Sequence, residues 1–141
     1  MKALTNIAIS VALLIFPGNA FAAQQDIGKR EYEANCGVCH GIEGKGDGPI
    51  AESLVKPVPS LTRLIKDNGG IFPFERVYSM IDGTEATVKA HGSRDMPIWG
   101  DEYKVEVYER HGRYYGGMIA EGIINGRILA LIAYIGRLQE D

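Results

Sequence analysis

The most regular pattern of hydrophobic positions lies near the C-terminus of the chain. Five aliphatic side chains recur there at spacings of four, three, four and three residues: Ile124, Ile128, Leu131, Ile135 and Leu138. This period places all five on one stripe of an α-helix that faces a core. Asn125-Gly126 interrupts the pattern, so we expect either a kink at this point or a helix that begins near Arg127.

Three shorter helices are expected earlier in the chain, over residues 26–35, 61–66 and 73–81. Asp26 can cap the first, Ser60 can cap the second, and Pro73 can begin the third. The segment that follows, up to residue 100, shows no clean period and is interpreted as a loop. The next segment, up to residue 117, is polar and aromatic and receives no assignment. The pattern predicts a small all-α domain with few short helices and long loops.

The N-terminal segment differs in character from the rest of the chain. Lys2 is the only charged residue among the first 22, and an almost unbroken apolar run covers residues 7–16 before Ala20-Phe21-Ala22. This pattern is typical of a cleaved secretory signal peptide. The run is about half of the roughly 20 residues that a membrane span needs, which disfavours an uncleaved anchor. We therefore expect residues 1–22 to be removed and residues 23–141 to form one periplasmic domain without a membrane span.

Composition narrows the class of protein. Hydrophobic residues make up 45% of the chain and charged residues 23%, as in folded globular proteins. Fifteen Lys and Arg face eighteen Asp and Glu, a net charge of −3, which becomes −4 once Lys2 is removed. No basic surface dominates, so nucleic-acid binding is not expected. Two cysteines are too few for a disulfide framework. The eighteen glycines, roughly twice the usual share, favour a loop-rich fold built closely around something.

The chemistry of the chain is concentrated in Cys36-Gly37-Val38-Cys39-His40, a C-x-x-C-H motif. Two cysteines three residues apart at the end of a helix face the same side, so each thiol can add across one vinyl group of a haem. His40 can then offer a neutral imidazole nitrogen to the iron. The motif therefore predicts one haem c, bound covalently through Cys36 and Cys39.

Other uses of a C-x-x-C pair remain as alternatives. A zinc site needs four ligands, and beyond the cysteines only His40, His91 and His111 are plausible partners, none of them at finger spacing. A thioredoxin-like redox pair would accompany a βαβ pattern, which is not visible here. A plain structural disulfide is the remaining alternative in an exported protein.

An iron held by His40 has a second axial position. Its candidate ligands are Met80, Met96, Met118, His91 and His111. Met80 and Met118 fall in predicted helices, where a methionine is more often part of the core. Met96 lies in an irregular loop bracketed by glycines and is followed by Pro97, and such a loop can bring a thioether onto iron. We predict Met96 as the ligand, with His91 or an open position as the alternatives.

With these motifs in this order, the chain resembles the class I monohaem cytochromes c of bacteria over nearly all of residues 26–139. The resemblance is carried by Gly28, Tyr32, Cys36-x-x-Cys39-His40, Gly48-Pro49, Met96-Pro97 and Tyr134. It implies an all-α, cytochrome c-like fold whose short helices and long loops wrap one covalent haem. It also implies that the first helix crosses the last, where Gly28 would allow close backbone approach and Tyr32 and Tyr134 would pack beside the crossing.

The resemblance suggests roles for further residues near the haem. In the family, a proline after the haem motif offers its carbonyl to the second nitrogen of the ligand histidine. Pro49 matches this proline, with Pro57 and Pro59 as alternatives. Trp99 is expected to pack on the haem or to donate its indole N–H to a propionate, unless it is a plain core aromatic. Arg94 can pair with a propionate or remain a solvated surface residue.

These expectations together predict an electron-transfer protein and no enzyme. His40 and Met96 would close both axial positions, so a substrate could not bind at the iron. A thioether ligand favours Fe(II) and raises the potential relative to two histidines. Electrons would leave through the haem edge near the thioethers, in weak and transient complexes with a donor and an acceptor protein. The alternative function is a haem subunit held permanently by a dehydrogenase or an oxidase.

Overall fold

The structure, a computed structural model, describes residues 26–84, 96–112 and 117–140. These residues form helices and connecting turns without a β-strand. In chain order the elements are α1 (Ile27–Asn35), α2 (Gly37–His40), the 3₁₀ helices η1 (Ala51–Ser53) and η2 (Lys66–Asn68), α3 (Phe74–Asp82), α5 (Trp99–His111) and α6 (Met118–Arg137). The predicted all-α class is confirmed. The predicted signal peptide lies outside the described residues.

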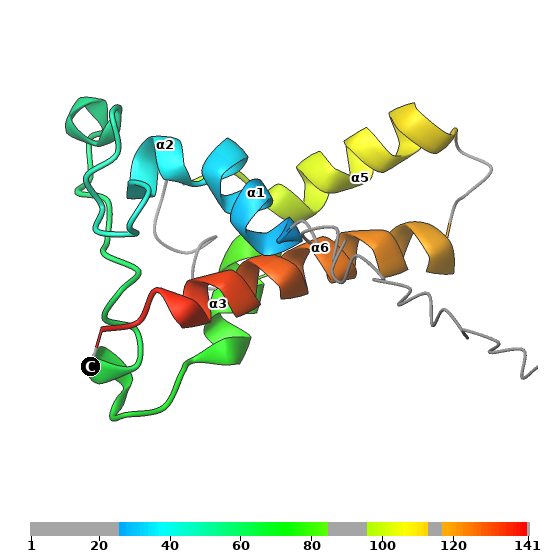
Figure 1. The fold of residues 1–141 in the computed structure, drawn as a ribbon. Helices are drawn as coiled ribbons and strands as arrows, with labels where there is room; N and C mark the ends of the chain where they lie inside the picture. The colour runs from blue at the N-terminus through cyan, green and yellow to red at the C-terminus, as the bar shows by residue number, and fades with distance from the viewer. Residues whose placement is uncertain (1–25, 85–95, 113–116, 141) are drawn as a thin grey trace, which may run out of the picture.

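Helix α6 is the centre of the molecule. Figure 1 shows α1 crossing it, and α3 and α5 also pack against it. The predicted stripe is correct: Ile124, Ile128, Leu131 and Ile135 are buried, and Leu138 packs against the same core. Among the described residues, only α6 is long and apolar enough to span a membrane, a property that core helices of globular proteins share.

The crossing of α1 and α6 depends on a missing side chain. A Cβ atom at Gly28 would lie 2.0 Å from the backbone oxygen of Ala130, so no other residue fits there without separating the helices. Tyr32 is fully buried beside this contact, and its ring centroid lies 5.1 Å from that of Tyr134. The predicted roles of Gly28, Tyr32 and Tyr134 are confirmed.

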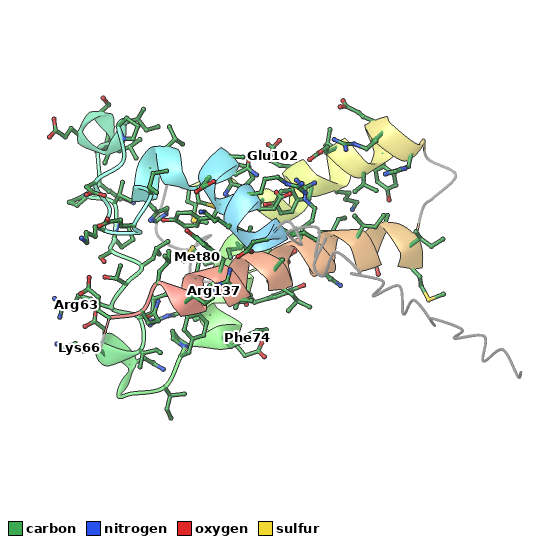
Figure 2. All side chains as sticks on the ribbon, viewed as in Figure 1. Arg63, Lys66, Phe74, Met80, Glu102 and Arg137 are labelled. Atoms are coloured by element: carbon green, nitrogen blue, oxygen red, sulfur yellow. The ribbon has the colours of Figure 1, made fainter. Side chains whose placement is uncertain are left out.

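The ends of α1 and α6 are also tied together. Asp26 caps α1, as predicted, by accepting a hydrogen bond from the Lys29 backbone N–H at 3.0 Å. Its second carboxylate oxygen pairs with the guanidinium of Arg137 at the C-terminal end of α6. Arg137 is labelled in Figure 2. The hydrogen bond from Lys29 and the charge of Arg137 lower the pKa of Asp26. Asp26 therefore caps α1 and also binds the C-terminal end of α6.

Helix α6 is continuous from Met118 to Arg137, so the predicted start near Arg127 is wrong. Neither residue of Asn125-Gly126 stops it. The side chain of Asn125 accepts a hydrogen bond from the hydroxyl of Tyr78 in α3 at 2.8 Å. Asn125 is a poor helix former, and this contact with another helix helps to hold it in α6. The helix begins instead after Gly117, which has a φ of 85°.

Two other regions differ from the expectations. Residues 101–117, which received no assignment, hold most of α5, whose first two residues lie in the preceding segment that we interpreted as a loop. It buries Tyr103 and Val107, four residues apart, and leaves Val105 exposed, as expected for one buried face of a helix. The predicted helix over 61–66 is a series of turns before η2.

The side chain of Gln139 holds this run of turns in place. It donates to the Leu61 carbonyl at 2.6 Å and accepts from the Ile65 N–H at 3.0 Å. These hydrogen bonds replace those that a regular helix would supply. The predicted cap Ser60 still accepts from the Thr62 N–H at 3.3 Å. The third predicted helix is confirmed as α3, which ends at Gly83 with a φ of 92°.

Candidate functional site

The C-x-x-C-H motif forms the turn that follows α1. Cys36 closes α1 with a hydrogen bond from its N–H to the Tyr32 carbonyl at 2.8 Å. The N–H groups of Cys39 and His40 then both bond to the Cys36 carbonyl, at 3.1 and 2.8 Å, which makes α2 a single helical turn. Both cysteines are free thiols, with Cys36 buried and Cys39 partly exposed. Burial, the first cause, raises the pKa of the Cys36 thiol to about 12 and keeps it protonated.

The imidazole of His40 is held in one tautomer. Its Nδ1 lies 3.1 Å from the backbone oxygen of Pro59. Because a carbonyl only accepts, Nδ1 carries the proton and Nε2 carries the lone pair. The ring is buried, and this burial lowers the pKa of His40 despite the hydrogen bond. His40 is therefore a neutral imidazole with Nε2 prepared to bind a metal.

The proline that orients His40 is Pro59, and the prediction of Pro49 is wrong. The loop after the motif folds back on itself, since the Gly46 N–H bonds to the His40 carbonyl at 2.8 Å and the Leu61 N–H bonds to the Gly44 carbonyl at 2.7 Å. This return brings Pro59 to the ring. Pro49 instead lies on the exposed outer side of the motif.

Two glycines let this loop lie directly on the motif. A Cβ atom at Gly48 would lie 2.4 Å from the Val38 backbone oxygen and 2.6 Å from the Cys39 carbonyl carbon. Gly41 has a φ of 77°, and its carbonyl accepts a hydrogen bond from the buried hydroxyl of Tyr32 at 2.8 Å. The backbone therefore surrounds the two cysteines closely, which accounts for part of the glycine excess.

Met96 lies three residues before α5, whose first turn packs against the end of α3. The two helices are in close contact, because a Cβ atom at Gly100 would lie 2.6 Å from the Asp82 backbone oxygen. Met96, four residues before Gly100, is partly buried against the hydrophobic core. Trp99 begins α5, is partly buried, and lies with its ring centroid 6.0 Å from that of Tyr103.

The other predicted site residues fall elsewhere. His91 and Arg94 lie outside the described residues. Met80 is partly buried in α3 and is labelled in Figure 2. Met118 is 88% exposed at the start of α6, so its expected place in the core is wrong.

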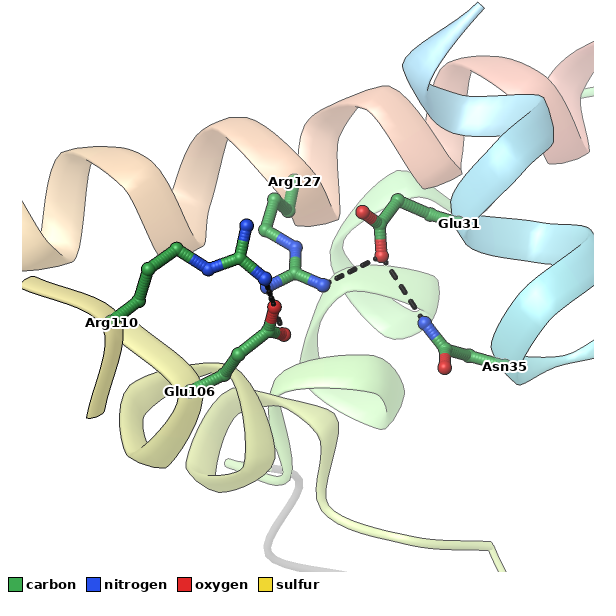
Figure 3. Close-up of polar contacts among 5 residues, drawn as sticks. All are labelled: Glu31, Asn35, Glu106, Arg110 and Arg127. Carbon is green, nitrogen blue, oxygen red and sulfur yellow. Dashed lines mark hydrogen bonds and ion pairs between the residues drawn. The ribbon is translucent and has the colours of Figure 1, made fainter. Parts of the chain in front are cut away.

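Sequence reasoning missed a charged cluster beside Cys36, drawn in Figure 3. Its members are Glu31 and Asn35 of α1, Glu106 and Arg110 of α5, and Arg127 of α6; we call it the Arg127 cluster. The guanidinium of Arg127 donates to Glu31 at 2.8 Å and to Glu106 at 2.6 Å, and it lies 3.8 Å from the ring centroid of Tyr103. The sequence signal that could have revealed this cluster is Arg127, a charged residue within the apolar C-terminal helix.

A profile of the cytochrome c family matches residues 25–139. Comparison with curated proteins and comparison with solved structures gave no match. The match covers nearly the whole described part of the chain. The protein belongs to the cytochrome c family, and it is a haem-binding electron-transfer protein with an all-α cytochrome c fold.

The residues of this site fit the covalently bound haem c that membership implies. Two free thiols lie on one helical turn, and the adjacent imidazole has its Nδ1 occupied and its Nε2 available. Cys36 and Cys39 would hold the haem and His40 would bind its iron. When bound, the haem supplies a one-electron Fe(III)/Fe(II) couple.

Proposed function

We propose that the protein is a class I, monohaem electron carrier of the bacterial periplasm, with His40 and Met96 as axial ligands. The observation that carries this proposal is the orientation of His40, since a carbonyl-bound Nδ1 fixes and strengthens the imidazole as a permanent iron ligand. The position of Met96 just before α5, partly buried against the core, supports its role as the second ligand. Two protein ligands leave no position for a substrate, which favours electron transfer over catalysis.

The visible spectrum of the purified holoprotein tests the ligation. The oxidised form is expected to show the weak red band of a methionine–iron(III) bond, and the reduced form the sharp bands of a low-spin haem c. Met96→Ala should abolish the red band and allow rapid binding of carbon monoxide to the reduced protein. Met80→Ala is the matched control and should change neither property. A red band that survives in Met96→Ala would contradict this ligation.

The surface beside Cys39 supports transient docking of redox partners there. Val38, Ile42 and Ile50 are exposed around the motif, and the Ile50 N–H bonds to the Val38 carbonyl at 3.2 Å. Glu43 and Lys45, which follow the motif in the chain, pair with each other at 2.6 Å. A small apolar surface of this kind favours brief contact with the donor and the acceptor.

Export to the periplasm is supported by the N-terminal sequence, whose apolar run and Ala20-Phe21-Ala22 match a cleaved signal. N-terminal sequencing of the protein from a periplasmic extract is expected to begin at Ala23. A chain that retains Met1 in the membrane fraction would contradict export with cleavage.

A second candidate function is a haem subunit that remains bound to one dehydrogenase or oxidase. It is favoured by the apolar side chains exposed at the start of α6: Met118, Ile119 and Ile123. Such side chains are more typical of permanent interfaces than of a free carrier. Size-exclusion chromatography of the native extract separates the two functions, because a carrier elutes near its own mass of 15.4 kDa or less and a subunit elutes with its partner.

A further inference from the structure

The Arg127 cluster contains a buried ion pair that the proposed function does not use. The side chains of Glu31 and Arg127 are only 11% and 18% exposed. Glu31 also accepts a hydrogen bond from the amide of Asn35 at 3.2 Å. A buried carboxylate without a bound cation would be costly, and the guanidinium of Arg127 is the cation bound to Glu31.

This ion pair lies next to the first haem-binding cysteine. Glu31 and Asn35 are on the last turns of α1, which ends at Asn35, directly before Cys36. The amide of Asn35, the residue directly before Cys36, donates to the Glu31 carboxylate at 3.2 Å, which places this carboxylate close to the attachment point. After burial, the negative charge of Glu31 is the next cause that raises the pKa of the Cys36 thiol, in agreement with this placement. An unpaired negative charge here would oppose the addition of an electron to a haem bonded to Cys36.

We propose that Arg127 is a positioning residue that neutralises Glu31 beside the haem attachment and thereby keeps the Fe(III)/Fe(II) midpoint potential high. This inference rests on the electron-carrier function proposed above. Negative charge near the iron stabilises Fe(III), whereas a paired carboxylate has little net field. In each reduction the iron gains one electron from a mediator, which is oxidised by one electron, and no proton is taken up.

Midpoint potentials of the holoprotein, measured by spectroelectrochemical titration with mediators, test this proposal. Arg127→Gln leaves the Glu31 carboxylate without its cation. At a fixed potential, the ratio of Fe(II) to Fe(III) should fall roughly tenfold, which is about 59 mV for a one-electron couple. Glu31→Gln should shift the potential in the opposite direction. The double variant, which removes both charges, should return towards the wild-type value.

Two further variants separate charge from structure. Arg127→Lys keeps the positive charge and loses the forked geometry, so its potential should stay near the wild-type value. Arg110→Gln is the matched control, because its side chain is 68% exposed at the outer end of the same cluster. It should leave the potential unchanged. Equal shifts in the Lys and Gln variants of Arg127, or no shift in either, would overturn the proposal.

Failure of this inference can be told apart from failure of the proposed function. If the wild-type protein does not titrate reversibly as a one-electron couple, the carrier function itself is contradicted. If it does, and Glu31→Gln has the wild-type potential, only the role of the ion pair is overturned. Glu31→Gln also decides the matter should Arg127→Gln fail to fold, because its amide can still accept a hydrogen bond from Arg127.

Discussion

At the scale of single residues, the structure prepares His40 with a backbone oxygen instead of a side chain. The carbonyl of Pro59 fixes the tautomer, and the burial of the ring lowers the pKa of His40. Together they present a neutral Nε2, the form that binds iron. A neighbouring carbonyl is also held by a side chain, since the hydroxyl of Tyr32 binds the Gly41 oxygen directly after the motif.

Tyr32→Phe tests this second contact. The variant keeps the ring that packs on Tyr134 and leaves the Gly41 carbonyl without its buried donor, so the free energy of unfolding should fall by about 1–2 kcal/mol. Urea denaturation followed by circular dichroism measures the loss. Tyr108→Phe, which removes a hydroxyl from a partly buried tyrosine of α5, is the control and should cost less. Equal losses would contradict the importance of the Gly41 contact.

At the scale of elements, the structure shows which patterns can be read from the sequence. Helix α6 was predicted because Ile124, Ile128 and Leu131 repeat at helical spacing, and α1 because Asp26 is a good cap. Helix α5 was missed because Tyr103 and Val107 are its only large fully buried side chains, and charged residues fill most other positions. Its acidic first turn and basic last turn, which suit the helix dipole, were the unused signal.

The residues of the candidate site also differ in how well the sequence predicts them. The thiols and His40 are recognisable because their chemistry depends on residue type and on short spacing. Pro59 was only one of two alternatives to Pro49, because a backbone carbonyl is available at every position and the returning path of the loop selects one of them. The ion pair of Arg127 with Glu31 joins residues 96 positions apart, a contact that no local pattern specifies.

The contact between α1 and α6 leads to a prediction at the same scale. Gly28→Ala places a Cβ atom against the Ala130 backbone, which cannot move aside as a flexible side chain would. The helices must separate, and the free energy of unfolding should fall by about 1–3 kcal/mol in urea denaturation.

Gly126→Ala is the control for this substitution. It lies on α6 with open space around the added atom, and it should stabilise the protein by about 0.5–1 kcal/mol through helix propensity. A Gly28→Ala variant as stable as the wild-type protein would show that the crossing tolerates a wider separation.

At the scale of the whole molecule, charge and apolar surface are distributed unevenly. The Arg127 cluster joins α1, α5 and α6 with two positive and two negative side chains, so the three helices meet around a balanced set of charges. Exposed apolar side chains lie instead beside Cys39 and around the start of α6. The surfaces that we propose for partner binding therefore differ from the Arg127 cluster, and stability is the property that should respond to pH through the cluster.

The pH response follows from the direction of one pKa shift. The hydrogen bond from Arg127, followed by the charges of Arg127 and Arg110 against opposing burial, lowers the pKa of Glu106. The unfolded chain therefore binds a proton at Glu106 more readily than the folded protein does. This contribution to stability is complete above the unfolded pKa of about 4.3 and is lost as the pH falls through the lower folded value.

Glu106→Gln should accordingly make the free energy of unfolding less dependent on pH under acidic conditions. In urea denaturation between pH 7 and pH 3, the decrease in the free energy of unfolding should be smaller than in the wild-type protein. The difference should be less than about 1 kcal/mol, because the carboxylate is 42% exposed and screened by solvent. Glu109→Gln removes the same charge from the same helix away from Arg127 and should keep the wild-type slope. If both variants follow the wild-type profile, the ion pairs of α5 do not contribute to acid stability, and packing alone holds this helix on α6.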